Sequence, residues 1–300
     1  MEGGNNRISY LLAFAATIVW SGNFIVARGL NAIYTPITIS FLRWLIACIV
    51  ILPIALPYIK KDFKLLVAQW KLMVLLSFLG VTIFNMLIYK AAHSTTALNL
   101  SLFAITAPFY VVILNRIIFK EHLTKRQIAG FLILAMGLLL LLTKGELSVL
   151  TTLQLNKGDL LMGAAASVFA TYTTLVRKKN PAIGNLSFVS STFLIGELML
   201  IPFFLTEQLV SGPDLNFTWQ STLQLLYIGI GPSVISFYLW NKAIVGIGST
   251  KAATIYNTLP IFSAILGAVI LKESVLPIQI LSSVVIIAGV SMVIWGRNRS

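Results

Sequence analysis

The stretch FKEHLTKRQIAGFLILAMGLLLLL (residues 119–142) recurs 152 positions later as LKESVLPIQILSSVVIIAGVSMVI (271–294). In each copy a Lys-Glu pair is followed six residues later by Gln, and then by a long apolar run with a glycine at 137 or 289. A helix that crosses the hydrocarbon core of a bilayer needs roughly 20 mostly apolar residues, and each run comes close to that length. The stretch therefore predicts a membrane helix that is encoded twice.

The composition of the whole chain agrees with this interpretation. Of its 300 residues, 58% are hydrophobic and only 10% are charged, whereas soluble domains carry about a quarter charged residues. These values exclude a soluble enzyme, a disordered chain and a nucleic-acid-binding protein, despite a net charge of +13. The single Cys48 excludes an internal disulfide, and two histidines are too few for a zinc cluster, so we predict no metal or cofactor. We predict an all-α membrane protein.

Apolar runs separated by clusters of Lys, Arg, Pro, Asn and Gly predict ten transmembrane helices. No connection is long enough to fold as a separate soluble domain. Inside lipid the backbone must satisfy its own hydrogen bonds, so these runs are expected to be helices, and they lack the two-residue alternation of barrel strands. The expected helices cover residues 8–30, 37–59, 70–90, 95–119, 125–143, 158–176, 185–206, 220–242, 249–271 and 276–295.

The basic residues predict the orientation of these helices. With the N-terminus in the cytoplasm, sixteen Lys or Arg residues fall inside and five fall outside, and Arg43 lies within a span. Such a bias is typical of the positive-inside rule. Both termini are therefore expected on the cytoplasmic side of a plasma membrane of the bacterial inner-membrane type. The basic surplus then indicates topology in a lipid bilayer and not a nucleic-acid partner.

The whole chain aligns with itself, without gaps, at the same shift of 152 residues. Thr106 and Pro108, for example, fall on Thr258 and Pro260. We therefore expect two domains, 1–149 and 150–300, with five helices each. Because five is odd, the second copy enters the membrane from the opposite side, which gives the inverted repeats of many secondary transporters. This symmetry allows inward-open and outward-open states of similar energy, and thus alternating access.

Several stretches resemble the drug/metabolite transporter (DMT) superfamily, specifically its EamA branch. They are VWSGNFIVARGL (19–30), TPITISFLRW (35–44), Pro108 in the fourth expected helix, and both copies of the repeated stretch. The second copy departs at Ser282, where the first has Gly130, and it lacks the basic pair at 125–126. The resemblance implies ten helices in two inverted five-helix repeats, a central cavity and alternating access. Characterised members of the family mostly export amino acids, other metabolites or toxic compounds, and some relatives import or exchange solutes.

Two charged side chains lie well inside expected helices. Arg43 is about 10 Å from the outer start of the second helix, and Glu197 is about 15 Å from the outer end of the seventh. A charge in hydrocarbon costs roughly 2.5–3.5 kcal/mol on insertion scales, so each needs a partner or water. Because the two helices are repeat equivalents, we expect the side chains to meet. Glu197 would then sense protons or a substrate amine, while Arg43 binds a carboxylate or sets the pKa of Glu197. The alternative is an ion pair that only joins the two halves.

Polar and aromatic residues on the inner faces of the expected helices predict a site for a small-molecule substrate. Rings would contact the apolar part of a solute and amides its polar ends. For the deep asparagines, hydrogen bonding between helices is the alternative role, and for Trp240 and Asn241 we expect the aromatic belt at the membrane surface. The candidate substrate-binding residues are Trp20, Asn23, Phe24, Arg43, Asn85, Tyr89, Asn99, Phe103, Tyr172, Glu197, Tyr238, Tyr256 and Asn257.

Pro108 and Pro260 occupy equivalent places in the middle of the fourth and ninth expected helices. A proline inside a helix removes a backbone hydrogen bond and permits a kink. The two prolines are therefore candidate hinges for the motion of one half against the other. A fixed bend that packs each helix is the alternative.

Together these features predict a secondary transporter of small metabolites. The first interpretation is an exporter of amino acids or similar amphipathic solutes. The chain lacks the Gly-rich loop with Lys-Ser/Thr that binds ATP phosphates. Proton coupling through Glu197 and facilitated diffusion stay open as energy sources. An importer or exchanger with the same fold is the second interpretation. A channel or receptor is the third, and a membrane enzyme acting on lipid is the last.

Overall fold

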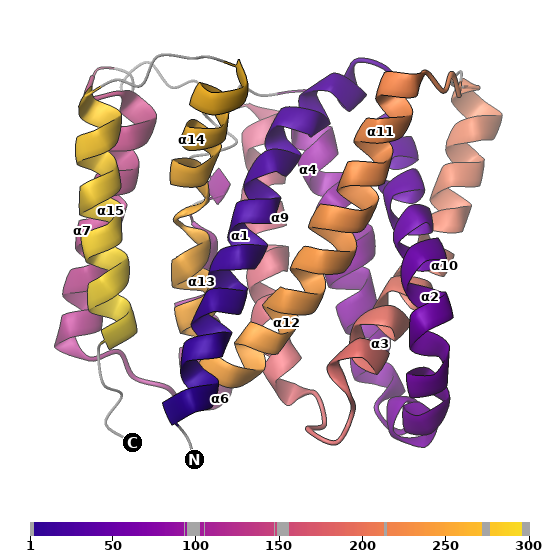
Figure 1. Cartoon of the computed structure of the whole chain (residues 1–300), viewed down its shortest axis with the longest axis horizontal. Coiled ribbons are helices and arrows are strands. Elements are labelled where there is room, and N and C mark those ends of the chain that lie inside the picture. Colours follow the sequence, from indigo (N-terminus) through magenta and orange to yellow (C-terminus); the bar gives the residue numbers. More distant parts are fainter. Residues whose placement is uncertain are drawn as a thin grey trace.

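The computed structural model describes residues 3–92, 94, 103–104, 106–146, 148, 156–212, 215–271 and 277–295, and within these ranges the chain forms helices and no strand. Figure 1 shows one bundle, in which α1 (Gly3–Asn31) begins and α15 (Pro277–Trp295) ends at the same end. The prediction of an all-helical membrane fold is confirmed. The count of ten crossings and the inversion of the second half stay predictions.

The described residues of the expected apolar runs are helical except for turns at Thr106 and at Asn257 and Thr258. Among the described residues, seven helical segments are long and apolar enough to cross a membrane. Several runs are divided into shorter elements, and two of these elements are π-helical. Between α1 and α15 the elements are α2 (Pro36–Ala68), α3 (Trp70–Ser77), π-helical η1 (Phe78–Ile83), α4 (Phe84–Ala92), α6 (Ala107–Phe119), α7 (Lys125–Thr143), α9 (Lys157–Leu175), the 3-10 turn η2 (Val176–Lys178), α10 (Asn185–Ser211), α11 (Trp219–Ile228), π-helical η3 (Gly229–Ile235), α12 (Ser236–Ile247), α13 (Ser249–Tyr256) and α14 (Leu259–Leu271).

Local side chains fix where these helices begin. The Thr124 hydroxyl accepts a hydrogen bond from the backbone N–H of Gln127, and the Gln127 side chain accepts one from the backbone N–H of Thr124. This capping box satisfies two N–H groups that a helix start leaves unpaired, and it begins α7 at Lys125. The glutamine of the repeated stretch is therefore a residue of the helix start. Similar boxes begin α9 (Asn156 with Asp159) and α11 (Thr218 with Ser221).

Helices α2 and α10 pack against each other, and each supplies an acid that caps the start of the other. Glu207, near the end of α10, accepts hydrogen bonds from the backbone N–H and the hydroxyl of Thr38 at 3.1 and 2.9 Å. Asp62, near the end of α2, accepts bonds from the backbone N–H of Gly184 at 2.9 Å and the hydroxyl of Ser187 at 2.6 Å. Carboxylates are favourable at helix N-termini, so the two caps tie this helix pair at both of its ends.

Helix boundaries and helix contacts both repeat at the shift of 152 residues. The bounds of α6 and α7 become those of α14 and α15, and η1 falls within η3. Helix α1 packs on α12 and α14, and its equivalent α9 packs on α4 and α6. The equivalents α7 and α15 pack on each other and stand side by side at the left of Figure 1. The first helix of each half therefore packs within the other half.

The apolar run 249–271 is broken near its centre. Helix α13 ends at Tyr256, Asn257 and Thr258 form a turn, and α14 begins at Leu259. Pro260 therefore lies in the first turn of α14. Because the first N–H groups of a helix have no partner within it, a proline there removes no helical hydrogen bond.

A matching arrangement precedes Pro108, which lies in the first turn of α6. Thr106 donates its backbone N–H and its hydroxyl to the carbonyl of Phe103, at 3.1 and 2.6 Å. Its equivalent Thr258 makes the same two bonds to Ile255, at 2.9 and 2.7 Å. The prediction that the two prolines lie in mid-helix is wrong, since each follows a turn and begins a new helix.

Candidate functional site

Trp20 of α1 lies at the centre of an aromatic cluster that both halves build. Its ring makes edge-on contacts with Phe169 of α9, Phe237 and Trp240 of α12, and Tyr256 of α13. The ring centroids lie 5.9, 5.6, 5.2 and 5.7 Å from that of Trp20, in the same order. Edge-to-face pairs at this separation are worth roughly 0.5–1.5 kcal/mol each. We call these five residues the Trp20 cluster, and it includes two of the predicted site residues, Trp20 and Tyr256.

The π-helical segment η3 holds Trp20 in place. π-Helical turns interrupt the regular bonding of a helix and are frequent at functional sites. The indole N–H of Trp20 donates to the carbonyl of Pro232 in η3 at 2.8 Å. One residue beyond η3, the hydroxyl of Ser236 donates to the carbonyl of Ala16 in α1 at 3.2 Å. The centre of the cluster is thus fixed by bonds that cross between the two halves.

Tyr172, another predicted site residue, extends the cluster. Its ring packs on Phe237, and its hydroxyl donates to Oδ1 of Asn241 at 2.9 Å. Trp240 and Asn241 are both 0% exposed, so the prediction that they lie in an interfacial belt is wrong. The reason is that α12 continues to Ile247, beyond the expected end at 242, which places both residues deeper in the bundle.

Arg43 lies beside this cluster and brings three predicted residues together. It is 3% exposed, and its Nε–H donates to the hydroxyl of Ser233 at 2.5 Å. Its Nη1 donates to Oδ1 of Asn85 at 3.1 Å and to the hydroxyl of Tyr89 at 3.3 Å. Ser233 follows Pro232, which holds Trp20, so η3 anchors both the guanidinium group and the indole. Nothing in the apolar patterning had indicated Ser233.

The expected pairing of Arg43 with Glu197 is wrong. Glu197 is 5% exposed, and neither carboxylate oxygen has a hydrogen-bond partner among the described residues. Within those residues the ion pair that forms is Arg177 with Glu121. The repeat equivalent of Arg43 is position 195, and the two further residues turn a helix by about 200°. Glu197 is therefore rotated away from the face that would meet Arg43.

Other buried polar atoms near the cluster also lack partners in the described part of the chain. They are both side-chain polar atoms of Asn257, Oδ1 of Asn23 and the indole N–H of Trp240. Asn257 is 1% exposed and directly follows Tyr256 at the break between α13 and α14. An unsatisfied buried polar group costs about 1–3 kcal/mol, so such groups call for water or a ligand. Two of the three residues, Asn23 and Asn257, were predicted.

The four remaining candidate residues are Phe103, Tyr238, Phe24 and Asn99, and the last two are not fully described by the structure. Phe103 is partly buried, and a ring atom of it lies 3.4 Å from the place that a Cβ on Gly163 of α9 would take. Tyr238 is half-buried, whereas its neighbours Phe237 and Trp240 are buried in the cluster. The side chain of Phe24 and the whole of Asn99 lie outside the described residues. Sequence reasoning missed Phe169 and Phe237, although their spacing of three from Tyr172 and Trp240 is that of one helix face.

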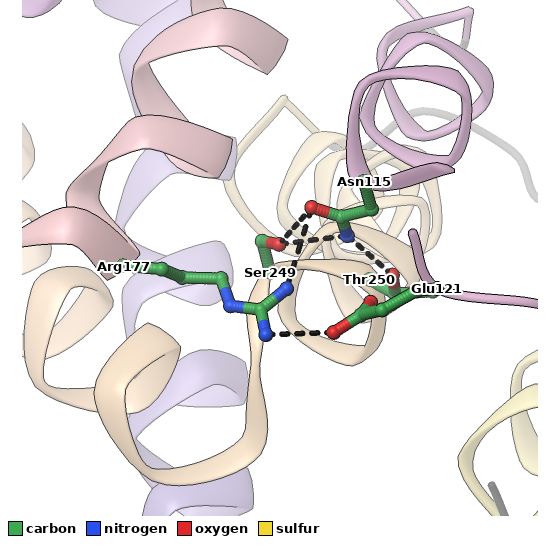
Figure 2. Close-up of polar contacts among 5 residues, drawn as sticks. All are labelled: Asn115, Glu121, Arg177, Ser249 and Thr250. Carbon is green, nitrogen blue, oxygen red and sulfur yellow. Dashed lines mark hydrogen bonds and ion pairs between the residues drawn. The ribbon is translucent and has the colours of Figure 1, made fainter. Parts of the chain in front are cut away.

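A polar network joins three elements at one end of the bundle (Figure 2). Arg177 of η2 forms an ion pair with Glu121 at 2.6 Å and donates to Oδ1 of Asn115 at 3.4 Å. Asn115, at the end of α6, donates from Nδ2 to the hydroxyls of Ser249 at 2.9 Å and Thr250 at 2.7 Å. Figure 2 shows the amide of Asn115 between the hydroxyls of Ser249 and Thr250, with the guanidinium group of Arg177 bonded to its oxygen. A cavity of about 20 Å³, room for about one water, lies beside the network.

No group of three or more His, Cys, Asp or Glu side chains that could hold a metal ion occurs among the described residues. The Trp20 cluster supplies aromatic rings, and the described residues beside it supply amides and the guanidinium group of Arg43. Such a set can bind a partly apolar solute with polar ends.

The comparisons with known proteins agree with the interpretation that this protein is a transporter. The model of the EamA-like transporter family matches twice, over residues 7–143 and 156–295. An uncharacterized transporter of Archaeoglobus fulgidus is 27% identical over 95% of this chain and 96% of its own length. A probable amino-acid metabolite efflux pump of Salmonella typhimurium is 24% identical over 97% of this chain and 96% of its own length. A solved crystal structure with 18% identity matches 95% of both chains at a TM-score of 0.75, which shows a shared fold.

These relatives are transporters and efflux pumps, not enzymes. The two matches of the family model together cover nearly the whole sequence. The chain therefore belongs to the EamA-like transporter family and is an integral membrane transporter.

Proposed function

We propose that the protein is a secondary transporter that exports small amphipathic metabolites, amino acids among them, by alternating access around the Trp20 cluster. One observation carries the proposal. Two equivalent helices are interrupted before Pro108 and Pro260, and the second interruption directly follows Tyr256 of the cluster. Discontinuous helices of this kind form the solute sites of many secondary transporters. The interruptions, rather than kinks at the prolines themselves, are the proposed hinges.

For the architecture we propose ten crossings, with the domains 1–149 and 150–300 inserted in opposite senses. The repeat of helix bounds and contacts at 152 residues supports a duplication, and so do the two separate matches of one family model. Helix α1 begins and α15 ends at the same end of the bundle, which agrees with an even number of crossings (Figure 1). The bias of basic residues supports cytoplasmic termini.

For the solute site we propose that the rings of Trp20, Tyr172 and Tyr256 contact the apolar part of the substrate. The unpaired amide oxygen of Asn23 and the unpaired amide of Asn257 would bind its polar groups, because binding would satisfy them. Arg43 has no acidic partner among the described residues and would attract a carboxylate. The proposal of amino-acid export draws on the name of the Salmonella relative.

For energy coupling we propose that Glu197 takes up and releases a proton during the cycle. The support is geometric, since the carboxyl group is almost fully buried and unpaired in the described structure. A buried carboxylate without a partner is unfavourable, whereas the protonated form is neutral. Facilitated diffusion without a proton is the alternative.

Purified protein in proteoliposomes would test this function. Vesicles loaded with a labelled amino acid are diluted into buffer with and without a pH gradient, and the retained label is followed against empty vesicles. We expect saturable release of at least one amphipathic amino acid, faster with the gradient. Release that never saturates for any member of a broad metabolite panel would contradict the proposed transport. Saturable release that ignores the gradient would contradict only the proton coupling.

A further inference from the structure

We propose that α13 is a gate, and that hydrogen bonds from Asn115 to Ser249 and Thr250 latch it closed at one end of the bundle. The inference rests on the proposed function only in one respect, namely that the gate would admit the transported solute. Its structural content, a short helix whose first turn is hydrogen-bonded to Asn115, is independent of any substrate.

Helix α13 is built as a separate short body. It has 8 residues, and the turn at Asn257 and Thr258 separates it from α14. On its other side Gly248 has φ +81° and ψ 160°, a conformation that L side chains rarely adopt, and a Cβ there would meet nothing within 4 Å. The backbone can therefore change direction at Gly248 with little steric resistance, and the turn at Asn257 and Thr258 leaves α13 no continuous helical connection to α14.

The latch uses every polar atom of the Asn115 side chain. Nδ2 donates to the Ser249 and Thr250 hydroxyls at 2.9 and 2.7 Å, and Oδ1 accepts from Ser249 at 3.0 Å. Asn115 is 1% exposed, so its amide would lose these bonds without replacement by bulk water. The bonds join the end of α6 to the first turn of α13, and α6 also packs on α13 and on α9.

Arg177 positions this amide. Its Nη1 donates to Oδ1 of Asn115, its Nη2 pairs with Glu121, and its Cζ lies 4.2 Å from the centre of the Phe119 ring. A planar guanidinium group can make all three contacts at once, whereas the ammonium of lysine cannot. Arg177 and Glu121 thus orient the amide that bonds to α13 (Figure 2).

The repeat lacks a second latch. At the shift of 152 residues, Asn115 corresponds to Gly267 and Arg177 to Ile25, and the two hydroxyl residues correspond to Ala97 and Leu98. None of these four residues carries a polar side-chain atom, so the equivalent bonds cannot form at the other end. The two gates of a symmetric transporter are therefore unequal, and the resting state favours closure at the end that carries Arg177. A ligand must overcome this bias to open that end.

The motion of α13 can be measured without a substrate. Ala253 of α13 is 3% exposed and packs on Val111 of α6 and Ala170 of α9, so its exposure reports separation of α13 from both helices. We would introduce Ala253→Cys in a Cys48→Ala background and measure the rate of maleimide labelling in detergent micelles. The latch variants are Asn115→Ala and the double variant Ser249→Ala/Thr250→Ala. The matched control is Ser282→Ala/Ser283→Ala, which removes two hydroxyls that bond only within α15.

We expect both latch variants to label at least about thirtyfold faster than the parent, since each loses two or more hydrogen bonds of about 1 kcal/mol, and the control to label at the parent rate. Thr250→Val keeps the side-chain shape and removes one hydrogen bond, so it can be tested even if the larger changes disturb folding. We expect its labelling rate to be about fivefold that of the parent. Parent-like labelling of the folded latch variants would overturn the inference. Because labelling needs no solute, a failure to observe transport would leave this result unaffected.

Discussion

The crossing of α7 and α15 offers a sharp test of the packing between the two halves. A Cβ added to Gly289 would lie 2.6 Å from the backbone nitrogen of Leu134 and 2.8 Å from the carbonyl oxygen of Gly130. Ordinary contact begins at 3.4 Å, so the closest of these atoms is about 0.8 Å too near. Both atoms belong to the backbone and cannot move away by rotation of a side chain. Gly289→Ala must therefore push the two helices apart.

The expected effect is a loss of stability of about 1–3 kcal/mol, the range for overpacked positions. Gly163→Ala is the matched control, because its Cβ would meet a ring atom of Phe103 at an ordinary 3.4 Å. Within a helix, alanine is favoured over glycine by roughly 0.5–1 kcal/mol, so the control should be neutral or slightly stabilising. The free energy of unfolding would be measured for both by denaturant titration in mixed micelles. If Gly289→Ala were as stable as Gly163→Ala, the close approach of α7 and α15 would be wrong.

Three further changes test the solute site, the coupling and the α2–α10 pair. Trp20→Ala should weaken substrate binding, measured by isothermal titration, about tenfold, because four ring contacts lose their central member. The Trp20→Phe variant should keep most of the affinity, and Trp219→Ala, which removes an exposed ring, should keep all of it. Glu197→Gln, which is permanently neutral, should leave transport without its dependence on a pH gradient in proteoliposomes, and an unchanged dependence would exclude Glu197 as the coupling group. Asp62→Asn should lower the free energy of unfolding by about 1 kcal/mol through loss of the charged cap of α10, and no change would show that the cap adds nothing.

Much of the fold could be predicted because its signals are local. The apolar run and the Thr124–Gln127 capping box place α7 at 125–143, and the structure has it at the same residues. The helix break in the run 249–271 was missed because hydrophobicity continues across it. Its signal was present in the sequence, since a threonine before a proline two residues later is typical of a helix start.

The site was harder to predict because it depends on rotation about helix axes. The rings of Trp20 and Tyr256 were found from their depth and helical spacing. Arg43 and Glu197 were expected to pair from their depth and from the equivalence of their helices, and an offset of two residues between the repeats turns them to different faces. Trp240 was misplaced because the end of its helix was set five residues too early. The role of Ser233 depends on a π-helical turn, which no pattern of apolar residues reveals.

The central claim is that two equivalent halves cross the membrane in opposite senses. The most direct test labels single cysteines at exposed positions that lie 152 residues apart, Lys64→Cys and Asn216→Cys, in a Cys48→Ala background. A membrane-impermeant maleimide would be applied to intact cells and to inverted vesicles. We predict that position 64 is labelled only from the cytoplasmic side and position 216 only from the opposite side. Labelling of both positions from the same side would contradict the inversion and the alternating-access mechanism that depends on it.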